Sequence, residues 1–138
     1  MARYYVDTCI WRDLAENRND HHQNLGQSAS FFLTQVIENN DLILWSIAVE
    51  REISHSPQKE RILDLMISLH KKKRLDTVEP TAEQWAEAAH VSLQRKIPYL
   101  DAFHAILARD NDAVLITRNS HFANVRDLVL SRKPEDIL

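Results

Sequence analysis

Three acidic residues stand where their carboxylates could share a metal ion. Asp7 ends an apolar run near the N-terminus, Glu52 lies in a helical segment after a second run, and Asp101 opens a helix before a third. Crowded carboxylates repel by roughly 4 kcal/mol for each close pair at an effective dielectric near 20, so cations or protons must compensate a cluster. Hard oxygen ligands favour Mg²⁺ or Mn²⁺, and such a cation binds substrate phosphate and activates water. A cation held by carboxylates in this way is suited to phosphodiester hydrolysis.

Five further polar residues are candidates for supporting roles beside these acids. Asn119 follows the clearest apolar run of the chain, and its amide oxygen can bind a metal or hold a metal-bound water. Thr8 stands next to the first acid, and Thr117 ends that same clear run. His104 lies three residues after the third acid, near its helix face, and Arg118 flanks the site at a position that cannot point into the core. We expect Arg118 and His104 to contact a substrate phosphate, with His121, two residues after Asn119, as the alternative to His104.

The order of apolar and amphipathic segments indicates how these residues are brought together. Runs typical of buried strands occupy residues 3–6, 42–45 and 113–117, with 75–78 and 125–130 as weaker strands, and amphipathic helices fall between them. This alternation predicts a three-layer α/β/α fold with a mainly parallel sheet, in one domain spanning residues 1–138. In such sheets the functional crevice lies beyond the carboxyl ends of the strands, where the four candidate ligands would meet.

The composition excludes several classes of protein. The only glycine, Gly26, cannot build a P-loop or a G-x-G-x-x-G turn, so enzymes that depend on those loops are excluded. No apolar run approaches the length of a membrane span, no signal peptide is recognisable, and Cys9 is alone, so we expect a cytoplasmic protein without disulfides. With a net charge of −3, nucleic acid must be met by local basic patches. The tryptophans are expected in the core: Trp11, Trp45 and Trp85.

Four segments carry a family resemblance. YYVDTCIWRDL, SIAVEREI, DAFHAILARDNDAVLITRNSHF and the closing KPEDIL resemble PIN-domain proteins, especially VapC-type toxin ribonucleases, over nearly the whole chain from Tyr4 to Leu138. The resemblance implies a compact α/β/α domain and Mg²⁺- or Mn²⁺-dependent cleavage of RNA that leaves a 5′-phosphate and a 3′-hydroxyl. It further implies a homodimer and a cognate antitoxin as partner.

The resemblance also assigns roles to individual residues. Asp7 in VDT matches the first acid of the family, Glu52 in the segment after Ser46 matches the second, and Asp101 in DAFHA matches the third. Thr117 in TRN matches the small hydroxyl residue before the last site position. The implied metal ligands are therefore the same three carboxylates that the pattern of apolar runs selects.

Two positions depart from the family pattern. Asn119 stands where the family often has a fourth Asp, so a second metal should bind more weakly because the amide carries no charge. Cys9 replaces a polar residue, usually Asn or Ser, two places after the first acid, which affects one hydrogen bond around the metal ligands.

The second acid has a rival two residues away. Glu50 and Glu52 point about 200° apart around a helix, so they cannot share a face. The spacing from Ser46, which is also placed to cap this helix, favours Glu52.

The sequence supports a metal-dependent endoribonuclease, as the toxin of a toxin–antitoxin pair, over three alternatives. A PIN-fold module that binds RNA or protein without cutting is favoured by the missing fourth acid, and a DNA-cutting nuclease would use the same metal chemistry. A phosphatase of the haloacid-dehalogenase type requires a second Asp two residues after the first, where Cys9 stands.

Overall fold

A five-stranded parallel sheet forms the centre of the molecule. The computed structural model describes residues 1–16 and 25–137. The strands are β1 (Arg3–Val6), β2 (Leu42–Ser46), β3 (Leu75–Val78), β4 (Val114–Ile116) and β5 (Ser131–Arg132). Their order in the sheet is β3-β2-β1-β4-β5, so the first strand lies in the middle, and every neighbouring pair is parallel.

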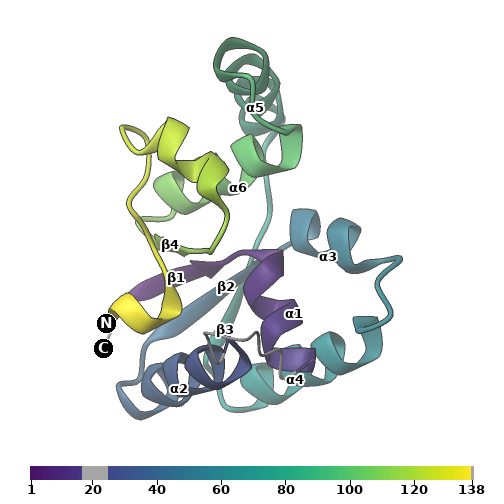
Figure 1. Ribbon diagram of the computed structural model, residues 1–138, viewed down its shortest axis with the longest axis vertical. Coiled ribbons are helices and arrows are strands. Elements are labelled where there is room, and N and C mark those ends of the chain that lie inside the picture. Colours follow the sequence, from purple (N-terminus) through teal and green to yellow (C-terminus); the bar gives the residue numbers. More distant parts are fainter. Residues whose placement is uncertain (17–24, 138) are drawn as a thin grey trace.

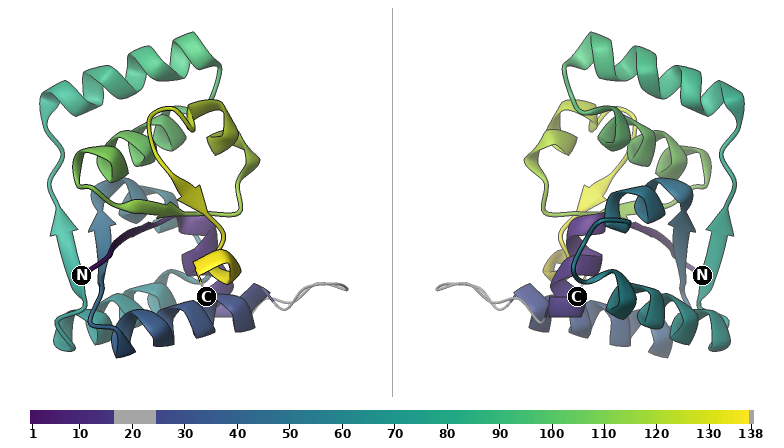
Figure 2. Two further views of the ribbon diagram at one scale, coloured as in Figure 1. Left: turned by 90° about the vertical axis from the view of Figure 1, so that its left-hand side faces the viewer. Right: turned by 90° about the vertical axis from the view of Figure 1, so that its right-hand side faces the viewer.

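Helices cover both faces of this sheet. The helices are α1 (Thr8–Glu16), α2 (Leu25–Glu38), α3 (Ile47–Ile53), α4 (Lys59–Lys71), α5 (Ala82–Arg95), α6 (Tyr99–Asp110), and the 3₁₀ segments η1 (Ser120–Val125) and η2 (Pro134–Ile137). Figures 1 and 2 show α1, α2 and α4 on one side of the sheet and α5, α6 and η1 on the other. The predicted three-layer α/β/α fold class is confirmed.

The central strands β1 and β2 are mostly apolar because both of their faces are covered. Residues 4–6 of β1 and 43–46 of β2 are all buried, as expected for a parallel sheet between two helical layers. Trp11 and Trp45 are almost wholly buried and meet edge to face with ring centroids 5.2 Å apart, as predicted for core residues. Trp85 is only partly buried and stacks on Phe103 at 3.8 Å.

Local signals in the sequence account for several element ends. Thr81 and Gln84 form the capping box that begins α5, each side chain bonding the backbone of the other. Ser46 takes the N-cap position of α3 as expected, but its hydroxyl makes no capping bond and instead lies 2.6 Å from the hydroxyl of Tyr5. Among the described helices, none has the length and apolar character needed to cross a membrane.

The strand predicted at residues 125–130 was wrong. Residues 120–125 form η1, which buries Phe122 and Val125 three residues apart, the repeat of a 3₁₀ helix. A turn follows, in which the carbonyl of Val125 accepts from the backbone N–H groups of Leu128 and Val129. The last strand therefore begins later, at Ser131, where it pairs with the end of β4.

The carboxyl edge of the sheet positions the first predicted ligand. The backbone N–H of Asp7 donates to the carbonyl of Ile116 at 2.9 Å, which extends the pairing of β1 and β4 by one residue. Helix α1 begins directly afterwards at Thr8. The side chain of Asp7 is therefore held where the central strand ends. In parallel sheets, ligands bind in the crevice beyond these carboxyl ends of the strands.

Candidate metal centre

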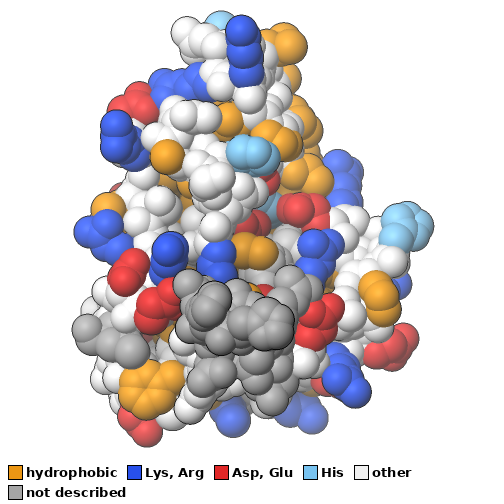
Figure 3. Space-filling model, in the orientation of Figure 1, with side chains coloured by type: hydrophobic (Ala, Val, Ile, Leu, Met, Phe, Trp, Pro, Cys, Tyr) orange, Lys and Arg blue, Asp and Glu red, His pale blue; other side chains and the backbone are white. Residues whose placement is uncertain are grey.

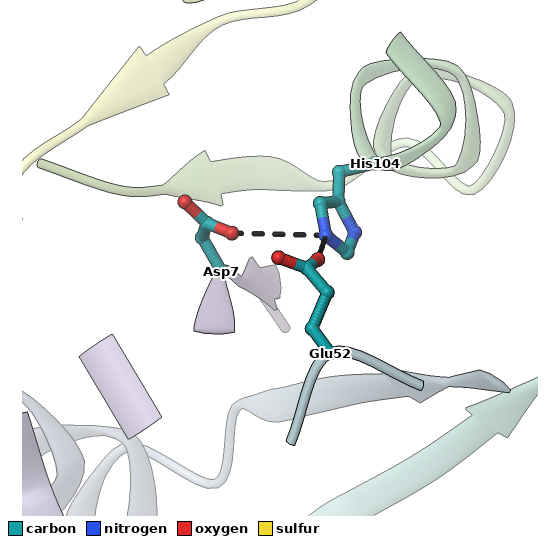
Figure 4. Close-up of side chains that lie close together, drawn as sticks. All are labelled: Asp7, Glu52 and His104. Atoms are coloured by element: carbon teal, nitrogen blue, oxygen red, sulfur yellow. Dashed lines mark hydrogen bonds and ion pairs between the residues drawn. The ribbon is translucent and has the colours of Figure 1, made fainter. Parts of the chain in front are cut away.

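Side chains from three distant segments converge at this edge of the sheet. Asp7 follows β1, Glu52 is near the end of α3, and His104 lies in the middle of α6 (Figure 4). One ligand atom from each of these residues falls within 4.8 Å of the others. His104 Nε2 is hydrogen-bonded to Glu52 Oε1 and lies 3.7 Å from Asp7 Oδ1. The arrangement is one that could hold a cation.

Short hydrogen bonds fix the carboxylate of Asp7. Its Oδ1 accepts from the backbone N–H of Thr8 at 2.7 Å, and its Oδ2 accepts from the hydroxyl of Thr117 at 2.7 Å. The thiol of Cys9 is a third donor, 3.4 Å from Oδ2. Burial, followed by the nearby charge of Asp7, raises the pKa of Cys9 to about 12. The cysteine is therefore a neutral donor, and it supplies the hydrogen bond that its departure from the family pattern had placed in question.

Asp101 belongs to a neighbouring group in the same region. Its Oδ2 accepts from the amide of Asn119 at 3.2 Å and from His121 Nδ1 at 2.9 Å. The amide oxygen of Asn119 accepts from the backbone of His121, while the Asn119 N–H donates to Thr117 Oγ1. Asp101 is close enough to His104 for its charge to raise the pKa of that imidazole. Thr117 thus links the two groups, since it also donates to Asp7.

Glu50 and Glu52 point in different directions, as the helix geometry requires. Glu50 Oε1 accepts from the indole N–H of Trp45 at 2.8 Å, so this carboxylate is occupied at the other side of α3. Glu52 is half-buried beside Asp7 and His104. Burial opposes ionisation of Glu52, but the hydrogen bond from His104 and its charge hold the pKa of the carboxyl below its ordinary value.

His104 is wholly buried, which differs from the expectation that it contacts a substrate phosphate. None of its surface is exposed, and its Nδ1 lies 2.7 Å from the hydroxyl of Tyr5. Burial would lower its pKa, but Glu52 and Asp7 outweigh burial, so the pKa is raised above the ordinary value. The sequence signal for this position was its spacing of three residues from Asp101, which places both on one side of α6.

The comparisons with known proteins agree with this architecture. Residues 4–128 match the family model of the PIN domain. The chain belongs to the PIN-domain family. A comparison with curated proteins found no significant match.

Three solved structures share the fold of this PIN domain at low sequence identity. VapBC2 from Rickettsia felis, bound to a DNA fragment from its promoter, has a TM-score of 0.67 and 22% identity, covering 95% of this chain and 98% of its own. VapBC-1 from nontypeable Haemophilus influenzae has a TM-score of 0.60, 18% identity and coverage of 96% and 98%. FitAcB from Neisseria gonorrhoeae has a TM-score of 0.57, 16% identity and coverage of 95% and 97%.

The donor set of this PIN domain fits a divalent cation. Asp7 and Glu52 bring carboxylate oxygens together within the centre, and Nε2 of His104 lies beside both of them. The hydroxyl of Thr8 is buried next to Asp7, and its hydrogen bond with Glu52 helps to lower the pKa of that carboxyl. A hydrated cation would neutralise the two carboxylates that these contacts hold in place. The other two predicted ligands, Asp101 and Asn119, are hydrogen-bonded to each other next to this trio, and Thr117 connects Asn119 with Asp7.

The surface around the PIN-domain centre combines both signs of charge. Figure 3 shows acidic side chains and histidine gathered in a hollow in the middle of one face, with lysine and arginine side chains around it. Such a pattern suits a polyanion whose phosphates are drawn to the rim while one phosphate reaches the centre. It matches the expectation that local basic patches compensate for the net charge of −3.

Arg118 is held in an ion-pair network rather than directed freely at the centre. Its guanidinium lies 3.2 Å from Asp13 Oδ2 and 2.7 Å from Glu135 Oε1, and its side chain is only 15% exposed. Asp13 comes from α1 and Glu135 from η2, so this arginine ties together three segments far apart in sequence. The contacts favour a structural role, and the predicted phosphate contact of Arg118 would have to compete with them.

We expect Arg118→Ala to lower the free energy of unfolding by about 3 kcal/mol, mainly because the carboxylate of Asp13, only 2% exposed, loses its ion pair with this guanidinium. Burial opposes ionisation of Glu135, but its hydrogen bond with Arg118 lowers the pKa of this carboxyl below the ordinary 4.5. The contribution of the Arg118–Glu135 pair, which is the smaller one because Glu135 is 36% exposed, is therefore complete above about pH 4.5 and is lost as the pH falls through the lowered value. The difference between wild type and variant should shrink below pH 4.5 in urea titrations.

Arg132→Ala is the matched control for this prediction. Arg132 is exposed and lines the same open pocket as Arg118, so its loss should change stability by less than about 0.5 kcal/mol. If Arg118→Ala changed the free energy of unfolding as little as Arg132→Ala, the ion pairs of Arg118 would not be needed for stability. Arg118 would then be available to contact a phosphate.

Proposed function

We propose that this PIN domain is an endoribonuclease that depends on Mg²⁺ or Mn²⁺, of the VapC type. The observation that carries the proposal is the convergence of Asp7, Glu52 and His104 within 4.8 Å, with Asp101 in the adjoining group. Carboxylates brought together from distant segments are costly without a cation, and PIN-family membership supports a nuclease as their use.

In this proposal each residue has a defined task. Asp7, Glu52 and Asp101 hold the cation directly or through water, and Asn119 orients Asp101 through the hydrogen bond from its amide. Thr117 keeps the carboxylate of Asp7 aimed into the centre. When bound, the cation lowers the pKa of a water and neutralises charge on the scissile phosphate, which prepares in-line attack.

The direct test is incubation of purified protein with labelled structured and unstructured RNAs and with matched single-stranded DNA. Cleavage should require Mg²⁺ or Mn²⁺, stop in EDTA, and leave a 5′-phosphate on the downstream product. Cleavage that persists in EDTA would contradict the metal mechanism. Cutting of DNA alone would move the proposal to a DNA nuclease, and RNA binding without cutting under any metal would indicate a binding module.

We further propose a protein partner for this toxin-like domain. The three structural neighbours, VapBC2, VapBC-1 and FitAcB, are named as two-component assemblies, which supports a cognate antitoxin. A short neighbouring reading frame for a DNA-binding protein, whose co-expression relieves growth inhibition by this chain, would support the pairing. Growth that is unaffected by the chain alone would argue against a toxin.

The proposed homodimer and the cytoplasmic location follow from the same assignment. Leu93 is 83% exposed on α5, and Tyr99 is 38% exposed at the start of α6, so this arm of the molecule offers apolar side chains to a second copy. Light scattering should give twice the monomer mass of 16.1 kDa. A monomeric mass at all concentrations would contradict the dimer.

Asn119→Asp should tighten metal binding at least about tenfold, within the range that residues around metal ligands produce. The new carboxylate would take the place of an amide that donates to Asp101, so the two acids would repel without a cation and share one when it is present. Isothermal titration calorimetry with Mn²⁺ measures the change, and thermal melts in EDTA should show a less stable variant. Unchanged affinity would show that this side chain does not act on the metal.

A further inference from the structure

The imidazole of His104 is buried among the carboxylates of the candidate centre. We propose that His104 Nε2 is itself a metal ligand, so that the centre has mixed nitrogen and oxygen donors and prefers Mn²⁺ to Mg²⁺. This inference rests on the proposed function and specifies which cation that function uses. It goes beyond the sequence-based expectation, which assigned the metal to carboxylates alone and made no choice between the two ions.

The position of Nε2 is the first support. This atom lies 3.7 Å from Asp7 Oδ1 and contacts Glu52 Oε1, and the three donor atoms fall within 4.8 Å of one another. Bonds from a cation to imidazole nitrogen or carboxylate oxygen are about 2.0–2.2 Å, so donors that share one ion stand about 3–4 Å apart. Figure 4 shows the Nε2 edge of the ring directed at both carboxylates. A cation placed among them would replace the Glu52 contact.

The other ring nitrogen supplies the second support. Nδ1 lies 2.7 Å from the hydroxyl of Tyr5, which lies 2.6 Å from the hydroxyl of Ser46, and all three side chains are buried. If a cation replaced the hydrogen bond between Nε2 and Glu52, Nδ1–H could donate to Tyr5 and Tyr5 to Ser46, which would leave the lone pair of Nε2 for the metal. Histidine ligands in proteins are oriented in this way, because a hydrogen bond to the second nitrogen fixes both tautomer and ring plane.

The burial of His104 distinguishes a ligand from a group that meets substrate. The ring has no exposed surface, whereas Glu52 beside it is 24% exposed and can be reached from solvent. A substrate phosphate therefore meets the open side of the centre, and the imidazole forms its inner wall. His121 differs from His104, since half of its side chain is exposed and its Nδ1 is hydrogen-bonded to Asp101.

An imidazole donor changes which cation the site selects. Mg²⁺ demands a nearly ideal octahedron of oxygen ligands and keeps several waters, whereas first-row transition ions accept nitrogen readily. Two carboxylates and one imidazole therefore suit Mn²⁺ better than Mg²⁺. The selectivity should reside in His104, since the remaining predicted ligands offer only oxygen.

Pulsed electron paramagnetic resonance of Mn²⁺ bound to the wild-type protein tests the ligand directly. Coupling to a directly bonded ¹⁴N should appear, because His104 would be the nitrogen donor to the ion. Calorimetric titrations with Mn²⁺ and with Mg²⁺ should give tighter binding of Mn²⁺. No variant is needed for this measurement, so a folding defect cannot obscure it.

His104→Asn then assigns the signal, with His90→Asn as the matched control on the exposed side of α5. The nitrogen coupling should vanish in His104→Asn, and Mn²⁺ affinity should fall at least about tenfold while Mg²⁺ affinity changes much less. The control should keep both properties. Mn²⁺ bound without nitrogen coupling would overturn this inference and leave the carboxylate nuclease standing, whereas failure of both ions to bind would overturn the proposed function as well.

Discussion

Asp7→Asn should reduce RNA cleavage at least about a thousandfold, the kinetic equivalent of about 4 kcal/mol of lost transition-state stabilisation. The substitution keeps the size of the side chain but removes its charge from the centre. It also places an amide nitrogen where one carboxylate oxygen now accepts from Thr8 or Thr117. The N–H of Thr8 or the hydroxyl of Thr117 would then face an N–H donor in place of an acceptor. Initial rates on labelled RNA at saturating Mn²⁺ measure the effect.

Asp41→Asn is the matched control for this substitution. Asp41 is another buried acid, but it precedes β2 and so lies at the opposite edge of the sheet, where its Oδ1 accepts from the backbone N–H of Ala2 at 2.8 Å. Asparagine can keep that bond, so activity should stay near wild type. Retained cleavage in Asp7→Asn, with the fold verified by circular dichroism, would remove Asp7 from the reaction.

Glu52→Gln should reduce cleavage at least about a hundredfold, whereas Glu50→Gln should change it little. Glu52 faces Asp7 and His104, and its charge would be needed to hold the cation. Glu50 accepts from the indole of Trp45, a bond that the amide oxygen of glutamine can also accept. The two variants share a chemical change and a helix, so they isolate the direction in which each side chain points.

Comparing kcat and Mn²⁺ affinity for this pair separates metal binding from other roles. The loss in Glu52→Gln should be accompanied by weaker Mn²⁺ binding in calorimetry, while Glu50→Gln should bind Mn²⁺ as the wild type does. The reverse ranking of the two variants would show that the helix presents Glu50 to the substrate and that the position of Glu52 is not functional.

The sheet and most of its helices could be predicted from the sequence because their signals are local. The run 113–117 contains β4, and the run 42–45 contains most of β2, since strands buried on both faces are apolar at every position. The last strand could not be placed this way. Residues 125–130 are apolar enough for a strand, but Val125 packs from a 3₁₀ segment and pairing with β4 begins only at Ser131.

In the candidate site, too, some features could be predicted from the sequence and others could not. Asp7 was predictable because it ends a strand at the carboxyl edge of the sheet. The burial of His104 was not, because residues 101–108 of α6 are all buried and periodicity cannot tell which of them faces carboxylates. Arg118 was expected at the surface, but its partners Asp13 and Glu135 come from distant segments, and only the folded chain brings them together.

Anomalous diffraction from crystals soaked in Mn²⁺, recorded at the manganese absorption edge, tests the central claim most directly. We expect an anomalous peak between Asp7 and Glu52, within bonding distance of at least one oxygen from each carboxylate, and its loss in crystals of Asp7→Asn. A wild-type map without a peak at this edge of the sheet, at Mn²⁺ concentrations that support cleavage, would contradict it.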